Sequence, residues 1–241
     1  MDSVVALHLG LDLNQETNGE AWVVRALAPR IRNFVDVGAN IGDWTQMVLE
    51  AVPGVERGFL FEPAEETASR LRERFVGDHR LEVIQAAASD SVGELEFFEE
   101  PDAGRHSSVL GAYARGARAV RVRCTTLDAE LESRGAETID YLKIDAEGHD
   151  LSVLRGAVQL LRSGRVAFLQ FEYNEAWRLS GSRLSDALAL LEGCDFDVFL
   201  LKSNALWTFP YDTYGEYYRY SNFVGVHRGT HIPKSMVRGR A

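Results

Sequence analysis

The sequence has few cysteines, little positive charge and no long apolar run. Cys124 and Cys194 are its two cysteines, and their spacing matches no metal-binding motif, so we expect two reduced thiols in a reducing compartment. No stretch approaches the roughly 18 apolar residues that a membrane span requires. The first residues (MDSVVALHLG) carry an early acid and no basic region, which is not typical of a signal peptide. These absences predict a cytoplasmic location.

Positive charge is scarce along the chain. Lysine and arginine total 26 against 36 for aspartate and glutamate, which gives a formal net charge of −10. A protein that binds nucleic acid neutralises phosphates with a basic surface, so this charge argues against nucleic acid as the main partner. The basic residues Arg228, Lys234, Arg238 and Arg240 gather near a C-terminal tail (229–241), whose last residues we expect to fray. We expect a small-molecule substrate; the sequence leaves the oligomeric state open, with a homodimer as one option.

Apolar segments alternate with helical patterns, which is typical of an α/β protein with a mostly parallel sheet. We expect a helical or irregular lead-in over residues 1–30 and one domain over residues 31–228. The predicted strands are Asn33–Val37, Arg57–Phe61, Leu81–Ala86, Glu94–Phe98, Ala119–Cys124, Thr138–Ile144, Val166–Phe171, Phe196–Leu200 and Phe223–Val226. The predicted helices are Trp44–Ala51, a segment opened by Pro63, Leu127–Arg134, Asp150–Leu161 and Leu184–Glu192. The long, tyrosine-rich segment Lys202–Ser221 is expected to be a functional or poorly ordered connection.

A glycine-containing turn follows the first predicted strand. The sequence DVGANIGDW, from Asp36 to Trp44, lies at a strand-to-helix junction. Gly38 and Gly42 allow a tight turn and a close approach of the backbone to a ligand, and Asn40 is a residue type that tolerates a positive φ. Together with the free N–H groups of the next helix, the turn predicts a nucleotide- or nucleoside-binding site. A tight turn without a ligand is the alternative.

Acidic residues also follow the second and third predicted strands. Glu62 lies 20 residues after Gly42, where a carboxylate binds the two hydroxyls of a ribose in NAD or in S-adenosylmethionine (SAM). Because Pro63 follows, Glu62 is equally suited to capping a helix. Asp90 is placed to accept a hydrogen bond from an adenine amine, with a further contact from Ser89, although a plain turn explains the pair as well.

The segment KIDAEGHD, from Lys143 to Asp150, follows another buried strand. In a 3-2-1-4-5 strand order, this strand lies beside the glycine turn at the topological switch point, where such sheets bind ligands. We therefore expect Asp145, Glu147 and His149 to meet at one crevice, which Glu172 approaches from the next strand as a base, a substrate acceptor or a cap. The alternative is that the two acids cap a helix while His149 is solvated.

Together these motifs resemble the FkbM-type SAM-dependent methyltransferases. The matching segments are DVGANIGDW, FEP, AAASDSVGELEF, HSSVL, TTLD, YLKIDAEGHDLSVLRG and FEYN, in order from about Phe34 to Val226. The resemblance implies a Rossmann-like class I methyltransferase fold: a seven-stranded, mostly parallel sheet in the order 3-2-1-4-5-7-6, its last strand antiparallel, with helices on both faces. It also implies O-methylation of a hydroxyl on a sugar or a secondary metabolite such as a macrolide.

The resemblance further implies which residues contact SAM. The glycine turn would line the methionine end of SAM. Glu62 would bind the ribose, and Ser89 and Asp90 would bind the adenine. The predicted cofactor-binding residues are Asp36, Gly38, Asn40, Gly42, Trp44, Glu62, Ser89, Asp90, Asp145 and Glu147. His149 stands where the family varies, so it is the weaker catalytic candidate.

Methyl transfer to an alcohol needs alignment and a base. Holding the oxygen, methyl carbon and sulfur in line supplies much of the rate, and a base removes the hydroxyl proton. The predicted bases are Asp145, Glu172 and His149, in that order. Mg²⁺ bound by Asp145 and Glu172 is an alternative, but no third carboxylate has suitable spacing, so we predict no metal site.

Two segments are predicted to shape the acceptor pocket. One is Gly104–Ser108, in the irregular stretch Pro101–Gly116, where flanking glycines would allow a lid to close. The other is the tyrosine-rich connection. The predicted substrate-contacting residues are Arg105, His106, Ser107, Ser108, Tyr173 and Tyr214. Aromatic rings with polar groups suit sugars or polycyclic rings, whereas a surface-packed loop would use the same tyrosines.

Other functions remain open from the sequence. An NAD-dependent oxidoreductase would use the same glycine turn and Glu62. However, this chain has no Tyr-x-x-x-Lys pair near the crevice, and an oxidoreductase function gives KIDAEGHD no role. A non-catalytic SAM-binding protein would keep the fold, and Asp145, Glu147 and Glu172 argue mildly against it. Nucleic-acid methylation is disfavoured by the acidic charge and by the lack of an Asn/Asp-Pro-Pro-Tyr motif.

Overall fold

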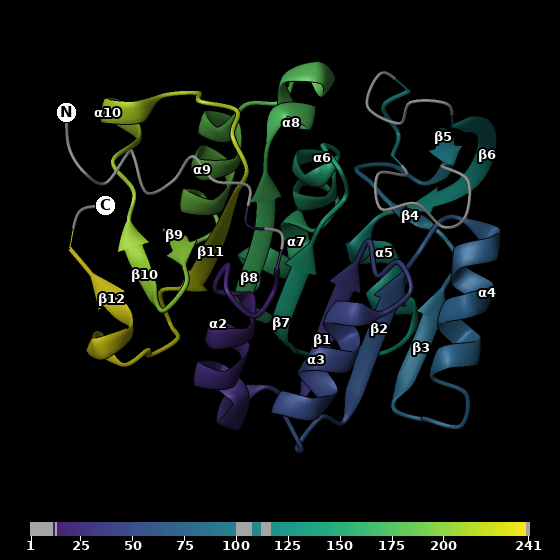
Figure 1. The fold of residues 1–241 in the computed structure, drawn as a ribbon, viewed down its shortest axis with the longest axis horizontal. Coiled ribbons are helices and arrows are strands. Elements are labelled where there is room, and N and C mark those ends of the chain that lie inside the picture. The colour runs from purple at the N-terminus through teal and green to yellow at the C-terminus, as the bar shows by residue number, and fades with distance from the viewer. Residues whose placement is uncertain (1–11, 13, 100–107, 112–116, 240–241) are drawn as a thin grey trace.

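A nine-stranded sheet crosses the molecule (Figure 1). The computed structural model describes residues 12, 14–99, 108–111 and 117–239. From one edge to the other, the strands are β12 (Val237–Arg238), β10 (Ala205–Thr208), β9 (Phe196–Lys202), β11 (Ser221–His227), β8 (Val166–Tyr173), β7 (Ile139–Ile144), β1 (Asn33–Val37), β2 (Arg57–Phe61) and β3 (Leu81–Ile84). The Rossmann-like α/β fold expected from the sequence is therefore present, in a larger sheet than expected.

Five neighbouring strands of this sheet are parallel. β3, β2, β1, β7 and β8 all run in one direction, so their carboxyl ends meet at a single edge. β1 and β7 are buried along almost their whole length, as strands covered on both faces must be. β11 is antiparallel to both β8 and β9 and brings its first residues to the same edge.

Helices cover both faces of the sheet (Figure 1). α2 (Glu20–Leu27) and α3 (Asp43–Ala51) pack on one face, where Trp44 meets Phe34 edge-on with ring centroids 5.9 Å apart. α5 (Leu127–Ser133), α6 (Asp150–Arg155), α7 (Val158–Arg162), α8 (Glu175–Ser180) and α9 (Leu184–Glu192) contribute to the core on the other. The remaining helices are α4 (Glu65–Arg74), α10 (Tyr211–Tyr214) and the 3₁₀ turns η1 (Ala28–Arg30) and η2 (Lys234–Met236).

A second sheet contains the strands β4 (Ala87–Ala88), β6 (Arg118–Thr125) and β5 (Gly93–Glu99) in that order. The strands predicted near Glu94–Phe98 and Ala119–Cys124 exist, but they pair with each other rather than with the main sheet. Cys124 and Cys194 are free and buried, as expected. Within the described ranges, no helix is long and apolar enough to cross a membrane.

The expected count of seven strands is wrong because two further strands, β10 and β12, extend the sheet beyond β9. β10 forms a hairpin with β9 inside the segment expected to be a connection, and it buries Leu206 completely. β12 then pairs with β10, and the neighbouring Met236 is 5% exposed, so this part of the expected tail is not frayed. Without β10 and β12 the order is β3-β2-β1-β7-β8-β11-β9.

The predicted helix Asp150–Leu161 is two helices, α6 and α7. Helix α6 ends just before Gly156, where a Cβ would lie 1.9 Å from the backbone oxygen of Ser89. The Asp128 carboxylate then accepts hydrogen bonds from the N–H groups of Gln159 (3.0 Å) and Leu160 (2.8 Å) at the start of α7. These contacts come from distant segments, so local periodicity does not reveal the break.

Candidate functional site

The turn after β1 has the backbone geometry that its glycines permit. Gly38, Asn40 and Gly42 have φ values of +75°, +50° and +87°. The Gly38 N–H donates to the Phe61 carbonyl at the end of β2 (3.0 Å), and a Cβ on Gly38 would lie 1.9 Å from the Asp145 carbonyl oxygen. The turn therefore holds the ends of β1, β2 and β7 in close contact.

Glu62, directly after β2, braces this turn. Its Oε2 accepts a hydrogen bond from the Asn40 N–H (3.0 Å), and its Oε1 accepts one from the Ala64 N–H (2.9 Å). Burial raises the pKa of Glu62 to about 7 in spite of these two bonds. Because a carboxylate offers about four acceptor sites, capacity remains for two hydroxyl donors. The bracing role and the predicted ribose-binding role are thus compatible.

A row of buried polar side chains crosses the middle of the sheet. Asp36 of β1 pairs in register with Lys143 of β7, which pairs with Gln170 of β8, so the three side chains share one face. Asp36 is fully buried; its Oδ2 accepts from Thr45 Oγ1 at 2.7 Å, and its Oδ1 has no hydrogen-bond partner. Burial raises the pKa of Asp36 to about 6, and Lys143 opposes that rise.

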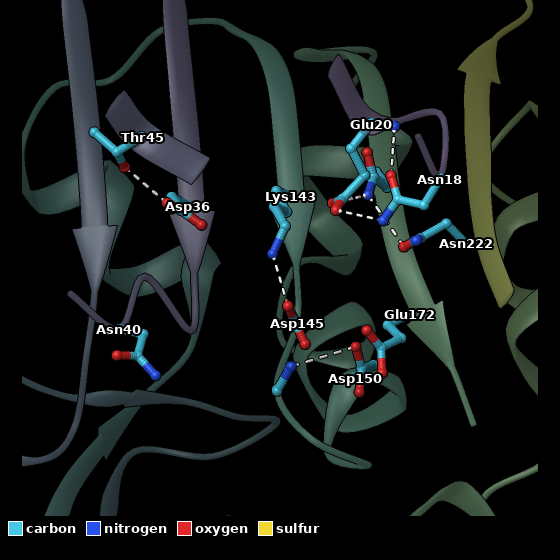
Figure 2. Close-up of polar contacts among 12 residues, drawn as sticks. Asn18, Glu20, Asp36, Asn40, Thr45, Lys143, Asp145, Asp150, Glu172 and Asn222 are labelled. Atoms are coloured by element: carbon cyan, nitrogen blue, oxygen red, sulfur yellow. Dashed lines mark hydrogen bonds and ion pairs between the residues drawn. The ribbon is translucent and has the colours of Figure 1, made fainter. Parts of the chain in front are cut away.

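Lys143 is the buried cation at the centre of the site, and the sequence assigned it no role. Its Nζ donates to Asp145 Oδ2 at 2.9 Å (Figure 2), and the residue is 4% exposed. Burial alone would lower the pKa of Lys143, but the carboxylates of Asp145, Glu20 and Asp36 raise it above its usual value. Among the residues that the structure describes, no other lysine or arginine is buried. A lysine inside an apolar strand is the signal that identifies it.

The carboxylates beyond Lys143 differ in their surroundings. Burial raises the pKa of Glu172 well above its usual value, and Asp145, Glu147 and Asp150 raise it further. Asp150 is 1% exposed, and burial followed by the charge of Asp145 raises its pKa to about 7. Burial therefore favours the protonated form of Glu172, whereas Asp145 has the Lys143 ammonium 2.9 Å from its Oδ2. Asp145 is consequently the better candidate for a base.

His149 is grouped with the residues predicted to bind adenine. Its Nε2 lies 2.9 Å from Ser89 Oγ, and the neighbouring Ser89 is 4% exposed. Burial lowers the pKa of His149, and Asp90 opposes this, so the imidazole is neutral near pH 7. This contact ranks His149 below Asp145 as a base and beside Ser89 as a cofactor contact.

The other predicted positions have mainly structural contacts. Trp44 is 3% exposed, its Nε1 has no hydrogen-bond partner, and its ring packs against those of Phe34 and Tyr141. Glu147 has a φ of +48°, and its carbonyl accepts from Ser108 Oγ at 2.8 Å. Tyr173 is fully buried and donates to Glu216 Oε2 at 3.0 Å, and Tyr214 stacks on Phe209 with centroids 5.6 Å apart. Arg105, His106 and Ser107 lie outside the described residues.

The donor set does not favour a metal ion. In the described part of the chain, no group of three or more His, Cys, Asp or Glu side chains is placed to hold one. Asp145, one of the two ligands considered for Mg²⁺, already has the Lys143 ammonium 2.9 Å from its Oδ2. The magnesium ion considered from the sequence therefore has no support.

Comparisons with known proteins agree with this geometry. A family model described as "Methyltransferase FkbM domain" matches residues 36–198. The chain is similar to the 2-O-methyltransferase NoeI of Sinorhizobium fredii (strain NBRC 101917 / NGR234), with 24% identity over 158 residues. That match covers 60% of this chain and 65% of the relative, which is less than two thirds of the relative's length.

Two solved structures share the fold. The methyltransferase FkbM from Methylobacillus flagellatus KT aligns with a TM-score of 0.54 and 16% identity, over 81% of this chain and 44% of that chain. The pre-rRNA processing protein fibrillarin of Methanococcus jannaschii aligns with a TM-score of 0.50 and 11% identity, over 89% of this chain and 76% of that chain. At these identities the likeness concerns the fold alone.

Proposed function

Since the chain belongs to the FkbM methyltransferase family, we propose that it transfers a methyl group from SAM to a hydroxyl of a sugar or secondary metabolite. The observation that carries the proposal is the position of Asp145, directly after β7 and against the glycine turn, with the buried Lys143 ammonium as its partner. Similarity to a protein named as a 2-O-methyltransferase supports oxygen as the methylated atom.

The residues present suit the chemistry of SAM. Its sulfonium is cationic, and the carboxylates of Asp145, Glu147 and Glu172 lie together where the family places the transfer site. Glu62 retains acceptor capacity for the ribose hydroxyls beside the two hydrogen bonds that it accepts from the Asn40 and Ala64 N–H groups. When bound, SAM supplies the methyl group and a neutral leaving group.

The chain's own residues would perform the proton chemistry. Asp145 would take the proton from the acceptor hydroxyl as the new O–C bond forms, a step worth about 10²–10⁴-fold in rate. The Lys143 ammonium fixes the orientation of Asp145 through its 2.9 Å hydrogen bond. Glu172, whose pKa is raised by burial, would lie beside Asp145 as a further hydrogen-bonding group for the acceptor.

The proposal predicts selective binding of S-adenosylhomocysteine (SAH). Isothermal titration calorimetry of the purified protein should show saturable heat with SAH and none with NAD. Glu62 suits the ribose of either compound, but the acidic crevice suits only the adenosyl amino acid SAH. Binding of NAD in place of SAH would favour an oxidoreductase. Binding of SAH without methyl transfer to any hydroxyl compound would favour a non-catalytic protein.

Binding of SAH should also release protons. With a pKa of about 7, free Glu62 is about half protonated at pH 7. Ribose hydroxyls donate to the ionised carboxylate, so binding lowers this pKa, expels the proton, and makes SAH affinity rise between about pH 6 and pH 8. Calorimetry at pH 7 in phosphate and in Tris should therefore give different binding enthalpies. The Glu62→Gln variant should remove the difference; a difference that persists would assign the proton to another group.

A further inference from the structure

Three neutral polar side chains meet beside the carboxylate crevice. Asn18 lies just before α2, Tyr220 just before β11, and Asn222 within it. The Tyr220 hydroxyl oxygen accepts hydrogen bonds from Asn18 Nδ2 (3.3 Å) and Asn222 Nδ2 (3.2 Å). All three residues lie outside the segment 36–198 that matches the family. They therefore belong to the parts of this chain that differ from the shared core.

The cluster adjoins Glu172, a neighbour of the proposed base Asp145. Asn222 is the cross-strand partner of Glu172, which follows Gln170 on the same face of β8. Burial raises the pKa of Tyr220, and Glu172, Glu20 and Asp145 raise it further, so the phenol keeps its proton. Tyr220 itself is only partly buried, and so is Asn18.

A buried network fixes the orientation of both amides. Gln170 Nε2 donates to Glu20 Oε1 (2.7 Å) and to Asn222 Oδ1 (3.1 Å), while Asn18 Nδ2 donates to Glu20 Oε2 (3.0 Å), as Figure 2 shows for the labelled residues. Because the Oδ1 of Asn222 accepts, its NH₂ group must point to Tyr220. The phenol oxygen thus receives two N–H donors, and it donates its own proton to none of the residues that the structure describes.

We propose that Tyr220, held by Asn18 and Asn222, binds the acceptor by donating a hydrogen bond to a hydroxyl oxygen of a neutral, polyhydroxylated molecule such as a sugar. This inference rests on the proposed methyl transfer. A neutral acceptor fits because the carboxylates of Asp145 and Glu20 would repel an anion. Hydroxyl groups both donate and accept, which matches a phenol and two amides in one cluster.

The test uses the Tyr220→Phe variant and three probes: the methyl glycosides of glucose, xylose and fucose. Binding of each glycoside to the SAH-loaded protein is measured by saturation-transfer NMR, and methyl transfer by radiolabelled SAM. Loss of one hydrogen bond should weaken glycoside binding and raise the KM for the glycoside about five- to tenfold, while the KM for SAM is unchanged. Tyr217→Phe is the control, because the Tyr217 hydroxyl donates within its own loop to Ser221 Oγ at 2.8 Å.

Each outcome decides the inference. An equal effect in both variants, an effect on the KM for SAM alone, or no effect of Tyr220→Phe would overturn it. So would SAH binding with no glycoside bound, which leaves the proposed methyltransferase function standing. Failure to bind SAH would instead remove the proposed function, and the acceptor site with it.

Discussion

Replacement of Asp145 by Asn should lower kcat for methyl transfer by about 10²–10⁴-fold and leave the affinity for SAH nearly unchanged. The amide keeps the shape of the side chain and can still accept the hydrogen bond from Lys143, so the fold and the binding site should persist. What is lost is the ability to take a proton from the acceptor hydroxyl. Steady-state kinetics with radiolabelled SAM and calorimetry with SAH measure the two quantities separately.

A matched control for this variant is Asp186→Asn, at an exposed position in the first turn of α9. It makes the same chemical change away from the crevice and should leave kcat unaltered. If Asp145→Asn retained full kcat, Asp145 would be removed from the proton transfer and the proton would have to leave by another route. If both kcat and SAH affinity collapsed together, Asp145 would belong to cofactor binding.

Part of the candidate site could be predicted because its sequence signals are local. β1, β2 and α9 begin and end where apolar runs meet glycine, proline or a change of period, and their bounds agree with the expectation. The pairing of β7 with β1 follows from the strand order of such sheets, so Asp145 and the glycine turn could be placed together. These features depend on neighbours in the chain and on a recurring topology.

The charge balance of the site depends on residues far apart in the chain. Lys143 is stable as a buried cation because Glu20, from a helix before the first strand, joins Asp145 and Asp36 around it. No pattern around Glu20 in the sequence predicts this contact. β12 likewise exists because residues near the C-terminus find an unpaired edge on β10. Such features depend on tertiary pairing, which local periodicity and spacing do not contain.

The contact between the glycine turn and β7 should make Gly38→Ala the most damaging small substitution in the site. The new Cβ would lie 1.9 Å from the Asp145 carbonyl oxygen, so the backbone that carries Asp145 must move. The left-handed φ of +75° adds a strain of about 1–2 kcal/mol, and overpacking adds about 1–3 kcal/mol more. We expect urea unfolding to show a loss of about 3–4 kcal/mol, and calorimetry to show no SAH binding.

Gly77→Ala separates the two causes. Gly77 has a similar φ of +87°, but a Cβ there would meet nothing within 4 Å. This variant should therefore show the strain of about 1–2 kcal/mol alone and retain SAH binding. Equal losses of stability in the two variants would mean that the turn tolerates a side chain by moving away from β7. In that case the close contact between Gly38 and Asp145 would not be what positions the base, and its orientation would rest on the Lys143 ammonium alone.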